Sequence, residues 1–237
     1  MQRKNYLVLT FSEIALEQFQ LLIENYHELE KYDKMCGEVV DLKNEIRNNY
    51  VITITFAAMS LEAFLNDYAA QNLGDDFYYD NFENLRPFAK LQLISRTIFN
   101  TTVESGGKLQ NYINILFRER NKLVHCKSEE FIGMNEEEYK EYKQFFQTHE
   151  DANEWMLAEN ERVHIDEEKD LLDNAISALR ALKEVARYID EKDSSAYASI
   201  GLLCSGWYID SDRKKYSLIK SAQLFLGVKP LISVGDV

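Results

Sequence analysis

Glycine and proline are scarce in this chain, whose 237 residues include only nine glycines and two prolines. Tight turns between strands usually need both, because glycine tolerates positive φ angles and proline fixes φ at a turn. The scarcity therefore favours long helices joined by few connections. The chain is also long enough to bury a full hydrophobic core without disulfides. We predict an all-α fold.

Apolar residues recur three and four positions apart in long segments, which is the spacing of a helix with one buried face. We expect one helix over residues 12–34, with Ser12 as its N-cap. A second is expected over residues 38–72, ended by Gly74. Its middle, VITITFAAM at residues 51–59, is β-branched, but no turn residues bound it, so we assign it to the helix.

Further helices are expected to begin at Pro87 and at Lys108, and Asp166 is expected to cap a strongly periodic one. On the helix from Lys108, the apolar residues predicted to be buried include Leu116, Leu123 and Val124. Residues 75–86 are aromatic and acidic, and we interpret them as a loop packed by its own side chains. The residues after Asp193 allow either two short helices or a hairpin with a tail.

The formal net charge of −13 is unevenly distributed. Residues 129–170 hold 15 Asp and Glu against 4 Lys and Arg, a net of −11, which leaves −2 for the rest of the chain. We interpret residues 129–165 as a solvated, acidic helical insertion. The preceding residues 118–127, RERNKLVHCK, form a small basic patch in which Glu119 is the single acid.

The three cysteines are widely spaced and odd in number, so they predict neither a disulfide framework nor a zinc site. Reduced thiols favour a cytoplasmic location. No small-residue cleavage site follows the N-terminus, and the longest apolar run is shorter than the roughly 20 residues that span a bilayer. We expect no signal peptide, no transmembrane helix, no metal and no cofactor.

The hexapeptide Arg120-Asn121-Lys122-Leu123-Val124-His125 is the strongest candidate for chemistry. A histidine can take a proton from a ribose 2′-OH or give one to the leaving oxygen, and an arginine can stabilise the negative charge that develops on the oxygens of the phosphorane. Asn121 is four residues from His125, so on a helix it could orient the imidazole. Because one histidine cannot comfortably be both acid and base, a two-fold-related subunit would supply the second.

The hexapeptide matches the R-N-x-x-x-H motif of HEPN-domain proteins, which the chain resembles over roughly residues 38–190. MSLEAFLND at residues 59–67, PFAKL at 87–91 and the helix at 171–190 are also similar to HEPN segments. The resemblance implies a HEPN-like helical bundle over residues 1–193 that contains the acidic insertion, followed by a C-terminal extension over 194–237. One departure is that Cys126 and Lys127 follow the histidine where some HEPN toxins carry a tyrosine, which argues against control by tyrosine modification there.

The family implies a metal-independent endoribonuclease, a toxin or antiviral defence effector, that acts on RNA as a homodimer; an antitoxin protein could be a further partner. The expected catalytic residues are Arg120, Asn121 and His125, with Glu62 as an acidic candidate that could equally be a surface glutamate. We assign Arg118, Lys122 and Lys127 to substrate binding. The first alternative is a non-catalytic HEPN module that binds a protein or a nucleotide. The second is a helical scaffold in which the hexapeptide is coincidental.

Overall fold

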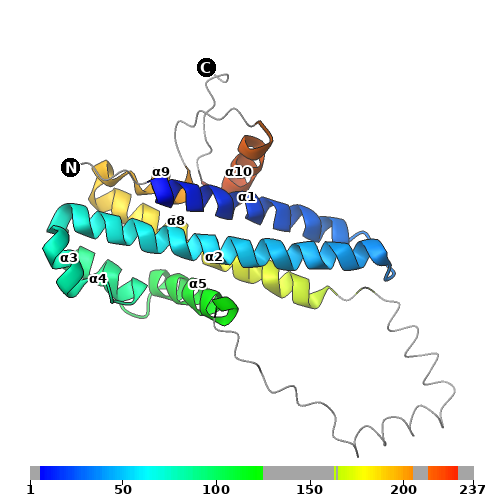
Figure 1. The fold of residues 1–237 in the computed structure, drawn as a ribbon, viewed down its shortest axis with the longest axis horizontal. Helices are drawn as coiled ribbons and strands as arrows, with labels where there is room; N and C mark the ends of the chain where they lie inside the picture. The colour runs from blue at the N-terminus through cyan, green and yellow to red at the C-terminus, as the bar shows by residue number, and fades with distance from the viewer. Residues whose placement is uncertain (1–5, 125–162, 164, 205–212, 229–237) are drawn as a thin grey trace, which may run out of the picture.

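The computed structural model describes residues 6–124, 163, 165–204 and 213–228, and these residues contain helices and no strand (Figure 1). The all-α prediction is therefore confirmed for them. The helices are α1 (Tyr6–Leu29), α2 (Gly37–Leu73), α3 (Asp75–Asn81), α4 (Pro87–Thr97), α5 (Lys108–Val124), α8 (Asp166–Lys192), the short 3-10 helix η1 (Ser194–Ala196), α9 (Ala198–Leu203) and α10 (Arg213–Phe225).

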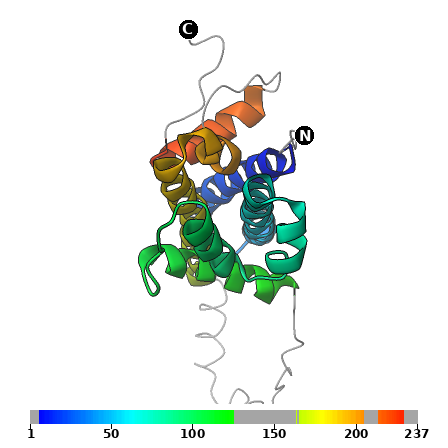
Figure 2. The same cartoon turned by 90° about the vertical axis from the view of Figure 1, so that its left-hand side faces the viewer.

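The long helices α1 and α2 form an antiparallel hairpin, and α8 packs against α2 (Figure 1). Helix α5 lies against both α2 and α8, while α9 and α10 pack on α1 (Figure 2). α3 and α4 lie near the end of α2 that is distant from the α1–α2 turn (Figure 1). None of the described helices is long and apolar enough to cross a membrane.

One continuous hydrophobic core joins these helices. Its fully buried members include Phe19 of α1, Leu61 of α2, Leu182 of α8 and Ile219 of α10. Residues beyond Asp193 therefore share the core, and of the two alternatives left open for them, the described residues form short helices.

The bounds of α2 agree with the prediction to within one residue at each end. Its β-branched middle is helical, and Gly74 ends it with a φ of 89° while its N–H bonds the carbonyl of Ala70. Pro87 is the first residue of α4, as predicted. Asp166 is the first residue of α8 and not its cap, since the N-cap position is held by Ile165 without a side-chain bond.

The prediction of a loop over residues 75–86 is wrong, because α3 occupies its first half. Phe82 at the end of this helix is fully buried, and its ring lies 5.8 Å from that of Tyr78, four residues earlier. One helical turn brings these two side chains to the same face. The predicted insertion over residues 129–165 lies outside the described residues, except for Val163 and Ile165.

The predicted N-cap at Ser12 is also wrong, because Ser12 is buried within α1. Its Oγ lies 2.6 Å from Ser60 Oγ on α2 and 2.7 Å from the carbonyl oxygen of Gly201 on α9. Val8 contributes a second carbonyl, 2.9 Å from Ser12 Oγ and 3.2 Å from Ser60 Oγ. A β-carbon at Gly201 would lie 3.4 Å from Val8 Cγ1, an ordinary van der Waals contact, so α9 packs directly on α1 here. This cluster ties three helices together.

Candidate active site: a basic groove beside a buried carboxylate

A groove of about 1380 Å³ is lined by residues from α2, α4 and α5. Its charged lining consists of four cations and one carboxylate among the described residues: Arg86, Arg118, Arg120, Lys122 and Glu62. All but Arg86 were singled out from the sequence, and Asn121 lines the same groove. The fold thus brings Glu62 to the same groove as the first residues of the hexapeptide. His125 and Lys127 lie outside the described residues.

Helix α5 buries Ile113, Leu116 and Glu119. The predicted burial of Leu116 is confirmed, and Leu123 is partly buried against the core. The prediction for Val124 is wrong, since this side chain is 56% exposed. Val124 lies five positions after Glu119 on the helix. Its side chain is therefore rotated about 140° around the helix axis from that of Glu119 and points away from the buried face.

Glu119 is the functional feature that the sequence analysis missed. This carboxylate is 4% exposed, and the hydroxyl of Tyr50 on α2 donates to its Oε2 at 3.1 Å. Arg118 Nε donates to Oε1 at 3.0 Å, and Lys122 Nζ lies 3.1 Å from both oxygens. Glu119 therefore tethers two groove cations whose side chains are otherwise 60% and 63% exposed.

The two cations keep Glu119 ionised. Burial raises the pKa of its carboxyl, but the hydrogen bonds from Lys122 and Arg118 outweigh this effect and hold the pKa below its usual range. Burial and the Glu119 charge together raise the pKa of Tyr50 well above its usual range, so its hydroxyl remains a donor. Arg120, in contrast, bonds its neighbour, with its Nη1 3.0 Å from Asn121 Oδ1.

We expect Glu119 to make unfolding stability depend on pH. Because its pKa is lowered in the folded protein, the stabilisation is complete above the carboxyl's ordinary pKa and is lost as pH falls through the lowered value. Glu119→Gln should therefore lose stability at neutral pH and show a shallower decline towards acid than the wild type. Urea unfolding at several pH values between 7 and 3 measures this, with the exposed Glu83→Gln as the control. Parallel pH profiles for wild type and Glu119→Gln would contradict the assignment.

Lys90 of α4 is the other buried ionisable residue beside the groove. It is 1% exposed, and its Nζ donates to Asn66 Oδ1 at 2.8 Å and to Glu62 Oε1 at 3.3 Å. The same Nζ lies 5.7 Å from the ring centre of Phe82. Glu62 is 36% exposed, so one side of it faces the groove and the other holds Lys90. Its catalytic role remains a prediction.

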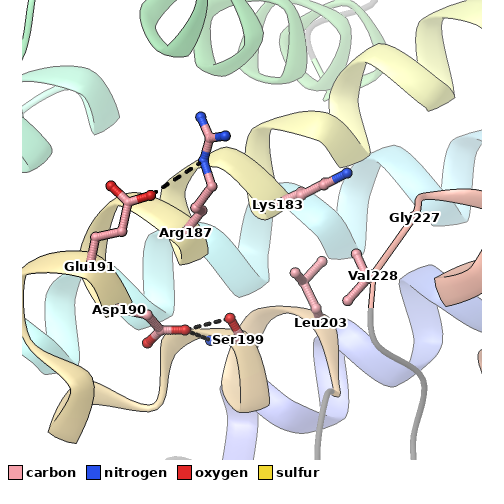
Figure 3. Close-up of a pocket in the computed structure, with 8 residues that line it drawn as sticks. All are labelled: Lys183, Arg187, Asp190, Glu191, Ser199, Leu203, Gly227 and Val228. Atoms are coloured by element: carbon pink, nitrogen blue, oxygen red, sulfur yellow. Dashed lines mark hydrogen bonds and ion pairs between the residues drawn. The ribbon is translucent and has the colours of Figure 1, made fainter.

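A second cavity of about 390 Å³ lies where α8 meets α9 and the residues after α10 (Figure 3). Its charged side chains are engaged with neighbouring groups. Lys183 donates to the carbonyl of Leu226 at 2.7 Å, Arg187 Nε lies 3.9 Å from Glu191 Oε1, and Asp190 accepts the N–H groups of Ala198 and Ser199. The Asp190 contacts hold α9 against α8, and the Lys183 contact holds the residue that follows α10.

Within the described part of the chain, no three His, Cys, Asp or Glu side chains gather as they would around a metal ion. Comparison of the whole chain with protein-family models, with curated proteins and with solved structures gives no match. Any functional assignment therefore depends on the groove and on the sequence motif that contributes to it.

Proposed function

We propose that this chain is a metal-independent endoribonuclease of the HEPN class, of toxin or antiviral defence type, and that it binds RNA in the groove between α2, α4 and α5. The main support for the proposal is that four cations line one groove: Arg86, Arg118, Arg120 and Lys122. Phosphate binding depends on such cations, and here they gather in a chain whose net charge is −13. The Asn121 amide and the Glu62 carboxylate add polar groups to the same groove.

The proposed reaction is attack by a ribose 2′-oxygen on the adjacent phosphorus. The bond from phosphorus to the 2′-oxygen forms and the bond to the 5′-oxygen breaks, which leaves a 2′,3′-cyclic phosphate and a 5′-hydroxyl. One histidine accepts the 2′-OH proton, and a second donates a proton to the departing 5′-oxygen. Arg120 stabilises the charge on the pentavalent phosphorane. With His125 as the only histidine of the motif, the second comes from another copy in a homodimer.

The alternative is a non-catalytic HEPN module that binds a protein or a nucleotide. The buried Glu119 favours it, because this carboxylate already engages Arg118 and Lys122. Two of the four groove cations are thereby partly neutralised, which lowers the electrostatic attraction for a long polyanion. A short ligand with one or two phosphates would depend on fewer cations.

The two functions differ in whether the protein cleaves RNA: the endoribonuclease yields defined products, and the binding module yields none. As an endoribonuclease, the purified protein should cleave single-stranded RNA in EDTA and leave 2′,3′-cyclic phosphate ends, which phosphatase removes only after acid opening. RNA with 2′-O-methyl groups and DNA of the same sequence should resist cleavage, because both lack the attacking hydroxyl. Electrophoresis of end-labelled oligonucleotides measures both results. Cleavage of the 2′-O-methyl strand, or loss of all cleavage in EDTA, would contradict the proposed mechanism.

A further inference from the structure

Lys90 of α4 is buried beside the groove, although lysine side chains are rarely buried. Its Nζ lies 5.7 Å from the ring centre of Phe82, which is fully buried as well. Two oxygens on α2 accept its protons, Asn66 Oδ1 at 2.8 Å and Glu62 Oε1 at 3.3 Å. An ammonium group has donors and no acceptor, so Lys90 fixes which atoms of these two side chains turn toward it.

Glu62 is the groove residue that Lys90 orients. Its side chain is 36% exposed and lines the groove, where it is the single carboxylate among the described charged residues. Lys90 engages Oε1, whereas Oε2 has no hydrogen-bond partner within the described part of the chain. Glu62 therefore offers the groove one acceptor oxygen, and a buried cation behind it holds the carboxylate in place.

The surroundings of Glu62 decide what kind of group can meet this acceptor. A cationic ligand would be repelled, because four cations line the same groove: Arg86, Arg118, Arg120 and Lys122. An anionic ligand such as RNA is attracted, yet its phosphate groups are repelled by the carboxylate itself. The parts of RNA that can donate to a carboxylate are the N–H groups of the bases and the ribose 2′-hydroxyl. The position thus suits an uncharged donor of a bound nucleotide.

We infer that Glu62 is a specificity-determining residue of the groove, whose Oε2 accepts a hydrogen bond from an exocyclic base amine or a ribose 2′-hydroxyl of the bound RNA. Lys90 is a positioning residue, which acts on the RNA only through Glu62. The inference rests on the proposed function, in that RNA is the ligand of the groove. It adds selection among nucleotides, which the groove cations cannot supply because the phosphate is the same in every nucleotide.

Glu62→Gln reverses the polarity of the group that faces the groove. Only the oxygen of the introduced amide can accept from Lys90, so the amide is held with its NH₂ group toward the groove. A donor thereby replaces an acceptor with almost no change of shape. In the double variant Glu62→Gln with Lys90→Met, the lysine no longer fixes the amide, and either end can face the groove. The single variant tests the contact, and the double variant tests the positioning.

Binding of fluorescent octanucleotides at one salt concentration measures the contact apart from cleavage. All proteins carry His125→Ala, so that RNA stays intact. If the donor is a base amine, the parent protein should bind an octamer of dC about tenfold more tightly than one of dU. Cytosine has an amine where uracil has a carbonyl, and a hydrogen bond to a charged group contributes about this factor. Glu62→Gln should reverse the order, and the double variant should bind the two octamers about equally.

The ribose arm of the experiment compares an octamer of rU with one of dU. If the donor is the 2′-hydroxyl, the parent protein should prefer the ribose form about tenfold, and Glu62→Gln should lower this ratio toward one. Glu83→Gln is the matched control, because it removes one exposed negative charge that does not line the groove. It should change the affinity for all the octamers alike and leave both ratios as they are.

Three results would overturn the inference. The parent protein could bind all the octamers equally, a result that needs no substitution at Glu62 and so counts even if that variant fails to fold. Both ratios could also stay unchanged in folded Glu62→Gln. A reversed order that persists in the double variant would remove Lys90 from the account. A protein that shows the preference but, with His125 intact, does not cut RNA would refute the endoribonuclease alone, whereas one that cuts RNA without any such preference would refute this inference alone.

Discussion

Arg120→Ala and His125→Ala should each lower the rate of RNA cleavage by about 10²- to 10⁴-fold, the usual cost of removing a general acid, a general base or a key cation. Phosphoryl transfer depends mostly on positioning and charge stabilisation. Within the motif His125 is the proton carrier, and Arg120 is the cation that Glu119 does not engage, since Glu119 binds Lys122. Arg120 lines the groove and bonds only its helical neighbour Asn121 among the contacts described above, so its loss should cost little stability. Single-turnover cleavage of a labelled RNA, together with thermal unfolding, separates lost chemistry from lost fold.

Cys126→Ser is the matched control for the histidine substitution. It changes the adjacent residue and leaves the imidazole of the motif intact. We expect its cleavage rate to equal that of the wild type. If His125→Ala instead cuts RNA at the wild-type rate, the activity does not arise from this motif, and the non-catalytic HEPN module becomes the better account.

Glu62→Ala should destabilise the protein by about 2 kcal/mol, because it leaves the Lys90 ammonium buried with Asn66 as its remaining hydrogen-bond partner. Breaking a fully buried ion pair costs about 3–5 kcal/mol, but here Glu62 is 36% exposed, which reduces the loss. The expected fall in melting temperature is about 4–8 °C for a chain of this length. Thermal or urea unfolding measures it.

A second substitution, at Lys90, shows whether the buried lysine charge causes the loss of stability in Glu62→Ala. Adding Lys90→Met to Glu62→Ala should restore most of the stability, because the apolar side chain fills the same space without an unpaired charge. Glu45→Ala, on the same helix at an exposed position that accepts a bond from the partly exposed Asn25 amide, should change stability by less than about 0.5 kcal/mol. If Glu62→Ala unfolds at the wild-type temperature yet loses cleavage, Glu62 acts on the substrate and not on Lys90.

The spacing of apolar residues, together with residues typical of helix ends such as Gly74 and Pro87, was sufficient to predict the long helices. The bounds of α2 follow from its apolar spacing and from Gly74, whose positive φ ends the helix. Ser12 was misassigned because a serine before an apolar run has the same local pattern whether it caps a helix or lies inside one. Only the partners on α2 and α9, distant in sequence, decide between these two roles. The aromatic segment at residues 75–86 concealed α3, since a seven-residue helix shows too few repeats to reveal its period.

The candidate site was predicted in part, through residues whose types already suggest chemistry. Arg118, Arg120 and Lys122 were recognised as cations, and the fold places them around one groove. Glu119 was interpreted only as the single acid of a basic patch, although it is buried and holds two of these cations. Its significance depends on Tyr50, which is 69 residues away in sequence, and no local pattern reports such a contact. Lys90 escaped notice for the same reason, because lysine is rarely buried and its partners lie on another helix.

The hydroxyl cluster of Ser12 and Ser60 has a consequence for how related chains can diverge. The Ser12 hydroxyl reaches the carbonyl of Gly201 on α9, whereas the Val8 carbonyl lies within reach of both hydroxyls. Loss of Ser12 would therefore remove the donor to Gly201, while loss of Ser60 would leave Ser12 to serve it. A β-carbon at position 201 would meet Val8 Cγ1 at 3.4 Å, an ordinary contact, so alanine fits there. Among descendants of this sequence, position 12 should therefore change less readily than positions 60 and 201.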